Sequence, residues 1–204
     1  MLRFSARELL NGLEGTAYVV DAQWRLVAVG QPNWRKFSDD NGGGALADEG
    51  ALLGRPLADF IDGEPVRSLW ASALASLDQG GVESVVVPYR CDAPTVHREM
   101  RMAVSAVIGE DGERYFLFHS VTLTERIRPP LRIFAPQARM GGNPPLVAMC
   151  SFCHSIRPGD EDHPWKTPEA YYADGGVSQV DITHSVCPDC HGDWLRSLGL
   201  AAPE

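Results

Sequence analysis

Cys150-Ser-Phe-Cys153 and Cys187-Pro-Asp-Cys190 are two C-x2-C pairs, and 33 residues separate them. Two residues between thiolates let both sulfurs of one tight turn face one metal ion, and two such turns complete a tetrahedral S4 site. A tetrahedron of four sulfurs is typical of zinc. Pro188 stiffens the second turn, and Gly192 suits a turn with positive φ. The spacing therefore predicts a structural zinc site with four ligands: Cys150, Cys153, Cys187 and Cys190.

Other chemistries use similar cysteine patterns. His154 and His191 each follow a pair, and C-x2-C-H is also the attachment pattern of c-type haem. That chemistry requires export, but the first ten residues lack an apolar stretch of signal-peptide length. We therefore expect a cytoplasmic protein with reduced thiols, which disfavours haem attachment and disulfides. A thiol-based redox sensor, in which oxidation releases the metal, stays an alternative. His184 is expected to orient a sulfur or to lie at the surface, not to bind the metal.

Composition and charge narrow the class of protein. The 204 residues are 44% hydrophobic and 22% charged, with a net charge of −9. Residues 146–204 hold three basic and nine acidic residues, so this segment alone carries −6. An acidic zinc segment has no electrostatic footprint for phosphate backbones, so we expect no nucleic-acid partner. No apolar run approaches the roughly 20 residues of a membrane span, so we expect no membrane partner.

Hydrophobic periodicity predicts the secondary structure of residues 1–126. Residues 1–126 read as an amphipathic helix, a two-strand hairpin, three helical stretches and three further strands. This order predicts an α+β domain with one five-stranded antiparallel sheet and helices on one face. The clearest elements are a hairpin at 16–30, a helix at 64–79 and strands at 82–89, 96–107 and 115–123, whereas 39–50 reads as a flexible excursion.

The C-terminal third reads as a linker followed by a small module. Residues 127–146 are rich in proline and glycine and predict an extended linker. Residues 147–198 form the predicted four-cysteine zinc-binding module, in which Trp165, Tyr171 and Trp194 supply a small core and a short helix closes the segment. The tail, 201–204, is expected to be unstructured.

Two resemblances connect these regions to signalling proteins. The Asp21-Ala-Gln-Trp24 turn between strands, the Asn33-Trp-Arg-Lys-Phe stretch and the Gly54-Arg-Pro-Leu-Ala-Asp step resemble a PAS sensor domain over about residues 12–125. The cysteine segment resembles one attached to some bacterial PAS proteins, although Thr183 and Ser185 depart from its Ser and Gly. The first resemblance implies a pocket enclosed by sheet and helices, regulation of a partner protein, and for many members a homodimer through an N-terminal helix such as 3–13.

The PAS resemblance raises the question of a cofactor. The helix at 64–79 has no histidine for haem, and 51–63 has no cysteine for flavin photochemistry. The alternatives left open are an unknown small molecule in the PAS pocket and a core filled by its own side chains. The aromatic residues that would line or fill it are Tyr18, Trp34, Phe37, Phe60, Trp70 and Phe118.

Several polar residues are candidate binding groups. His119 reads as a hydrogen-bonded sheet residue, and His97 as part of a charged, solvated face. Arg90, Arg98 and Arg101 would clamp an anion if two converged, but exposed arginines paired with Glu99 or Asp92 are the simpler expectation. Cys91 reads as a plain thiol.

The sequence shows no nucleophile elbow, phosphate loop or H-E-x-x-H motif, and four thiolates leave zinc no open position. We therefore expect no enzyme, but a PAS-type signalling protein with a structural zinc site that acts through protein-protein contacts. The alternatives are a small-molecule sensor and a redox sensor.

Overall fold

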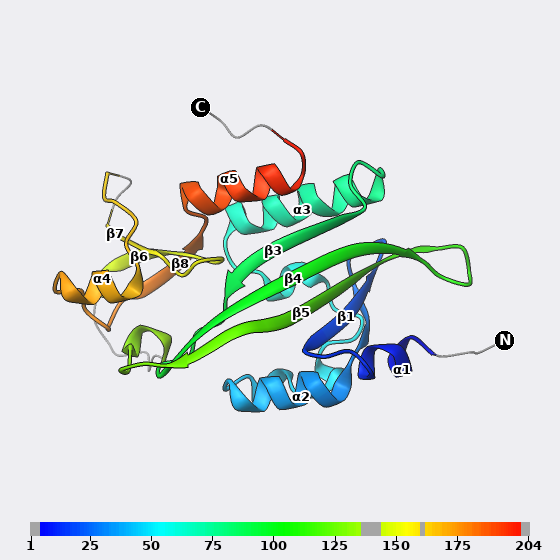
Figure 1. Ribbon diagram of the computed structural model, residues 1–204, viewed down its shortest axis with the longest axis horizontal. Coiled ribbons are helices and arrows are strands. Elements are labelled where there is room, and N and C mark those ends of the chain that lie inside the picture. The colour runs from blue at the N-terminus through cyan, green and yellow to red at the C-terminus, as the bar shows by residue number, and fades with distance from the viewer. Residues whose placement is uncertain (1–4, 136–143, 160–161, 201–204) are drawn as a thin grey trace. The chain divides into compact units, whose positions relative to one another are not determined.

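The computed structural model describes residues 5–135, 144–159 and 162–200 (Figure 1). Its helices are α1 (Ala6–Asn11), α2 (Gln31–Asp40), α3 (Glu64–Asp78), α4 (Pro168–Ala173) and α5 (Pro188–Ser197), with short 3-10 helices at Gly44–Leu46, Glu49–Ala51, Leu57–Phe60 and Arg132–Phe134. Its strands are β1 (Thr16–Asp21), β2 (Leu26–Val29), β3 (Ser84–Arg90), β4 (Val96–Ile108), β5 (Arg114–Ile127), β6 (Leu146–Cys150), β7 (Ile156–Pro158) and β8 (Asp181–Ser185). The start of the predicted first helix, part of the predicted linker and the tail lie outside the described residues.

The larger sheet has the strand order β2-β1-β5-β4-β3 (Figure 1). Strand β1 is antiparallel to both β2 and β5, and Tyr18 stands opposite Val29 on one side and Phe118 on the other. Short turns join the neighbouring strands β3, β4 and β5, so these pairs are antiparallel hairpins as well. The predicted α+β fold with a five-stranded antiparallel sheet is confirmed.

Aromatic rings cover one face of this sheet. Because Tyr18 and Phe118 are opposite each other in the register, they point to the same face, and their rings stack with centroids 4.7 Å apart. Trp34 of α2 meets Tyr18 edge-on at 6.0 Å, and Trp70 of α3 lies 5.6 Å from Phe118. Helices α2 and α3 therefore pack on the same face of the sheet.

The two motifs around the first hairpin meet in space. An Asp21 carboxylate oxygen accepts two backbone N–H groups of its own turn, at 2.8 and 2.9 Å, and Trp24 takes a φ of 61°. The N–H of Gly54 donates to the carbonyl of Leu26, and that of Leu57 donates to the carbonyl of Trp24, both at 2.7 Å. The Gly54 step thus lies against the hairpin turn, although about 30 residues separate them.

The segment 39–50 is more ordered than expected. It contains two of the short 3-10 helices, and the Trp34 indole N–H donates to the carbonyl of Leu46 at 2.7 Å. A buried indole needs a partner, and the short helix supplies one.

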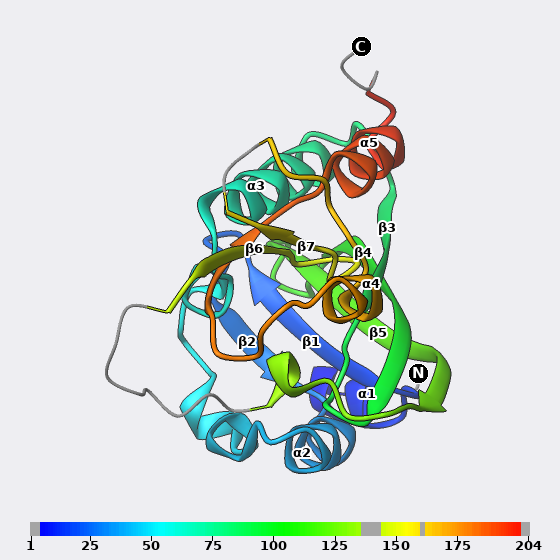
Figure 2. The same ribbon diagram turned by 90° about the vertical axis from the view of Figure 1, so that its left-hand side faces the viewer.

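A second, three-stranded sheet has the order β7-β6-β8 (Figure 1), and its strands β6 and β7 are also labelled in Figure 2. Strand β6 is antiparallel to β7 and parallel to β8. Its small core consists of Ile133, Val147, Met149, Ile156, Tyr171 and Val180. Tyr171 is thus a core residue as predicted, and so is Trp194, which packs on Phe152 with ring centroids 5.1 Å apart.

Backbone contacts group the chain into two compact units. The first comprises 1–61, 70–87 and 101–122, and the second comprises 62–69, 88–100 and 123–204. The second unit thus combines the cysteine segment with one end of strands β3, β4 and β5, and Ile133 of the predicted linker lies in its core. Whether 1–126 and 147–198 fold as independent domains stays a prediction.

Within the described part of the chain, no helix is both long and apolar enough to cross a membrane.

Candidate metal centre

The two cysteine pairs share one type of backbone hydrogen bond. Strand β6 ends at Cys150, and the N–H of His154 donates to its carbonyl at 3.0 Å. Cys187 is the N-cap of α5, and the N–H of His191 donates to its carbonyl at 2.9 Å. Pro188 occupies the first turn of α5, where its missing N–H costs nothing. Each turn therefore closes around its two sulfurs with a backbone hydrogen bond to the first cysteine.

Parallel pairing of β6 with β8 brings the distant turns together. Cys150 stands opposite Ser185, and the N–H of Ser151 continues the ladder to the carbonyl of Ser185 at 2.9 Å. Cys187 follows two residues later. The 33-residue separation in sequence is thus closed by one strand pair.

The four sulfur atoms all lie within 4.8 Å of one another. Tetrahedral zinc with bonds of about 2.3 Å places its sulfurs roughly 3.8 Å apart, and the sulfurs of Cys153 and Cys187 are 3.6 Å apart. This distance is far longer than a disulfide bond of about 2.05 Å, and all four cysteines are free. Cys150 and Cys187 are buried, whereas Cys153 and Cys190 are half-buried. The donor set and spacing fit one thiophilic metal ion.

The four thiols control one another's protonation. Hydrogen bonds from Cys150 and its neighbours hold the pKa of Cys153 far below its usual range. The hydrogen bond between the thiols of Cys150 and Cys153 acts to raise the pKa of Cys150. Hydrogen bonds from Cys187 and Cys190 have the opposite effect and lower this pKa to about 7. Interaction with Cys150 raises the pKa of both Cys187 and Cys190 well above normal. All four thiols become thiolates together only when a cation offsets their repulsion, which a bound metal does.

One detail of the predicted turns is wrong. Gly192 is buried inside helix α5 and is not a residue with positive φ. The left-handed residue is instead His154, with a φ of 59°. A helix that starts at the second pair needs no left-handed turn, whereas the first pair must turn the chain from β6 into β7.

The histidines near the centre have other partners. The sulfur group contains no histidine among the described residues. His184 Nδ1 lies 3.4 Å from the hydroxyl of Ser151, inside the first turn, and burial lowers the pKa of this histidine. His184 therefore contacts a hydroxyl of the first turn, and the predicted orientation of a sulfur by His184 stays a prediction. In the sheet, His119 Nε2 lies 2.7 Å from the carbonyl of Glu14, which confirms a hydrogen-bonded sheet histidine.

The three arginines do not form an anion clamp. Arg90 pairs with Asp92, and Arg98 donates to Glu125 at 2.8 Å. Arg98 is buried, which differs from the expected exposed residue, because its guanidinium also donates to the carbonyl of Cys91. Arg101 is exposed.

Sequence reasoning missed a buried charge network next to the first cysteine turn. The Asp92 side chain is completely buried and pairs with Arg90 and, at 3.1 Å, with Arg128. Arg128 also donates to Glu169 at 2.9 Å. Burial acts to raise the pKa of Asp92, but the neighbouring His154 ring and hydrogen bonds from Arg98 and Arg90 hold this pKa well below its usual range. The only indication of this network in the sequence was that Arg90 and Asp92 lie two residues apart.

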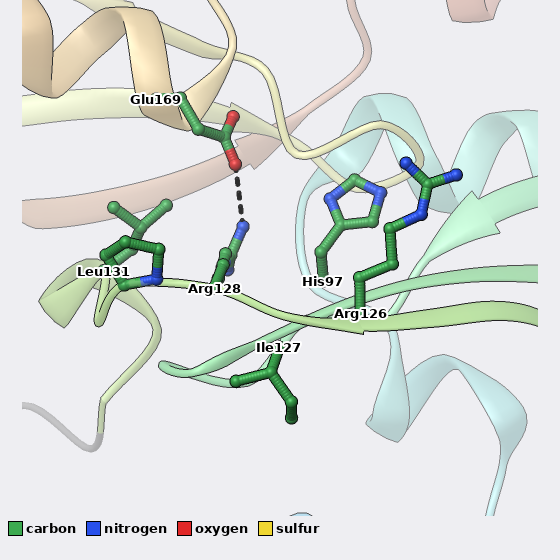
Figure 3. Close-up of a pocket in the computed structure, with 7 residues that line it drawn as sticks. His97, Arg126, Ile127, Arg128, Leu131 and Glu169 are labelled. Carbon is green, nitrogen blue, oxygen red and sulfur yellow. Dashed lines mark hydrogen bonds and ion pairs between the residues drawn. The ribbon is translucent and has the colours of Figure 1, made fainter.

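A pocket of about 400 Å³ adjoins this network (Figure 3). Three of its polar lining residues, His97, Arg128 and Glu169, already have polar partners. The guanidinium of Arg90 lies 3.0 Å from Nδ1 of His97, whose Nε2 lies 3.2 Å from Glu99, and Arg128 faces Glu169 across the pocket. His97 is therefore part of the network, and not a solvated surface residue. The remaining lining residues are Arg126, Ile127, Pro129 and Leu131.

Comparisons with known proteins do not identify a family for this chain. No family model matches the chain, and a search of curated proteins found no match. Among solved structures, the PAS domain of Bordetella pertussis BvgS is similar, with a TM-score of 0.43 and 18% identity, over 59% of this chain and 85% of that one. Similarity at this level does not assign the chain to a family.

Proposed function

We propose that this chain is a PAS-type signalling protein of the cytoplasm in which a structural zinc ion at Cys150, Cys153, Cys187 and Cys190 supports protein-protein contacts. The convergence of four free thiols within 4.8 Å carries the zinc assignment. The PAS assignment is supported by the sequence motifs and by the contact between the Asp21–Trp24 turn and the Gly54 step.

A structural role for the metal follows from the donor set and the size of the segment. Four thiolates complete a tetrahedron and leave no open position for a substrate, so we propose no catalytic function. The apolar core around the three-stranded sheet is small: Ile133, Val147, Met149, Ile156, Tyr171 and Val180, with Phe152 and Trp194 packed as a separate pair. Such a small core rarely supplies enough stability alone, so metal binding contributes folding free energy.

Metal analysis of the purified protein tests this proposal. We expect one zinc ion per chain, full retention in Cys91→Ser and loss in Cys187→Ser. Cys91 is the matched control because it is a free cysteine outside the sulfur group. Absent zinc, or an iron porphyrin signal in its place, would contradict the proposal.

A signalling role requires a protein partner, because the sequence shows no output motif. We expect the wild-type chain to capture a specific protein in its native proteome, and Cys187→Ser to lose it. Light scattering would show whether the chain is a monomer or a homodimer. Equal capture by both forms would argue against contacts that depend on the zinc segment.

The redox alternative has its own geometric support. Cys153 and Cys187 lie 3.6 Å apart, so oxidation needs little movement to join them. A redox sensor would release zinc at a low molar excess of peroxide, whereas a structural site would keep it. A ligand sensor would instead retain a small molecule in native mass spectrometry.

A further inference from the structure

We infer that Asp92 is a positioning residue for the metal centre, because its buried carboxylate holds the first cysteine turn in its metal-binding shape. The inference rests on the proposed zinc site and extends it to a residue 58 positions before the first ligand in the sequence.

The contact starts at the end of strand β3. The backbone N–H of Arg90 donates to the carbonyl of Phe152 at 2.6 Å, and its guanidinium donates to the carbonyl of Cys153 at 3.4 Å. Both acceptors belong to the first C-x2-C turn. One arginine thus fixes two consecutive peptide groups of the turn that carries the sulfurs of Cys150 and Cys153.

Asp92 fixes this arginine in turn. Its carboxylate pairs with the guanidinium of Arg90 and accepts the backbone N–H of Arg98 at 3.0 Å. It also pairs with Arg128, which donates to Glu169 of α4. A buried carboxylate is tolerated only with such partners, and a buried arginine that loses its carboxylate is left uncompensated. The ion pairs therefore hold the Arg90 side chain in one position.

Asp92 also reaches the left-handed residue of the turn. His154 directly follows Cys153, and its Nδ1 lies 3.6 Å from the Asp92 carboxylate, a polar contact slightly longer than a hydrogen bond. Its ring packs on Phe134 with centroids 5.2 Å apart. A φ of 59° is uncommon for a residue with a Cβ. Asp92 and Phe134 both contact the ring of this residue and restrict its position.

The test is the rate at which the zinc-loaded protein transfers its metal to an excess of a chromogenic chelator. Asp92→Asn keeps the size of the side chain and removes its charge. Substitution of a residue that supports metal ligands typically changes metal affinity by about 10- to 100-fold. We therefore expect zinc transfer to be at least about tenfold faster in Asp92→Asn than in wild type. Glu125→Gln is the matched control, because the Arg98–Glu125 ion pair that it breaks lies in the same unit but involves no residue of the cysteine turns.

A second variant separates positioning from general stability. His154→Gln leaves the ion pairs of Asp92 with Arg90 and Arg128 in place, and we expect transfer that is faster than in wild type but by less than about tenfold. If Asp92 acts partly through His154, the double variant will be no faster than Asp92→Asn. This non-additivity would not arise from independent losses of stability.

The outcomes distinguish the inference from the proposed function. Wild-type protein without zinc would overturn the proposed function itself. Zinc-loaded wild type with equal transfer rates in Asp92→Asn and Glu125→Gln would overturn only the role of Asp92. If Asp92→Asn does not fold, Arg90→Gln replaces it, because this variant removes the guanidinium that joins Asp92 to the carbonyl of Cys153, and transfer rates equal to wild type in both Arg90→Gln and His154→Gln would overturn the role of Asp92.

Discussion

The two units of this chain are stabilised by different means. The first has a large apolar core, and its most deeply buried side chains include Phe116, Phe118, Leu52, Leu74 and Leu77. The second also buries large apolar side chains, among them Met100, Ile156 and Trp194, but it adds buried charges and four converging thiols. The aromatic core of the first unit is stabilised by its own apolar burial. Buried charges cost free energy, so we expect the second unit to depend on a metal ion at the four thiols.

The comparison predicts which unit depends on the metal. Metal loss should affect the second unit, including its ends of strands β3, β4 and β5, and should leave the aromatic face of the first unit packed. Four substitutions test this difference.

Cys187→Ser should have the largest effect. We expect loss of zinc and unfolding of residues 147–198, because metal affinity is folding free energy for such a segment. Hydrogen exchange should also rise in 88–100 and 123–135, which belong to the same unit. Limited proteolysis and exchange mass spectrometry would measure both. An unchanged protease pattern would refute the metal dependence of the second unit.

Phe118→Ala should destabilise the first unit by about 3–5 kcal/mol through the cavity left beside Tyr18 and Trp70. Denaturant unfolding would measure the change, and metal analysis should still find zinc. Ile108→Ala on strand β4 is the control, because this isoleucine is 63% exposed and belongs to the same unit. Zinc loss in Phe118→Ala would show that the two units unfold together.

Tyr171→Phe should cost the second unit about 1–3 kcal/mol. The Tyr171 hydroxyl donates to the carbonyl of Val177 at 3.0 Å and accepts its N–H at 3.1 Å, so its removal leaves two backbone groups without this partner. Tyr115→Phe is the control, because the hydroxyl of Tyr115 makes an exposed hydrogen bond to Asp111. Thermal unfolding of the zinc-loaded variants would measure the difference. Equal unfolding midpoints for Tyr171→Phe and Tyr115→Phe would contradict the prediction.

Thr167→Ala should have the smallest effect, about 1 kcal/mol. The hydroxyl of Thr167 caps α4 by accepting the N–H of Ala170 at 3.2 Å. Thr167→Ser keeps the cap and should restore stability. A loss of zinc in the alanine variant would mean that α4 supports the metal site more directly than its cap implies.

Local patterns predicted much of this fold. Apolar residues at three- and four-residue steps predicted α3, and alternating runs bounded by glycine predicted the strands of the sheet. The four cysteines were predicted from their spacing and do converge. Gly192 was placed wrongly, because a glycine after a cysteine pair suits either a turn or a closely packed helix, and only the packing of α5 decides between them.

Such local patterns could not predict the buried charge network. Asp92, Arg98 and Arg128 look like surface residues in sequence, because charged side chains are usually exposed. In the folded chain all three side chains are buried or nearly so. Burial here depends on strand ends meeting a segment more than 50 residues away. No local periodicity encodes that contact.

The sequence by itself determined the α+β order of elements and the two cysteine pairs that converge, because these follow from periodicity and from short, fixed spacings. The tertiary structure decided how the two cysteine turns meet, through the parallel pairing of β6 with β8, and which charges are buried beside them. Long-range pairing and burial depend on segments distant in the chain, so they become visible only when the whole chain is folded.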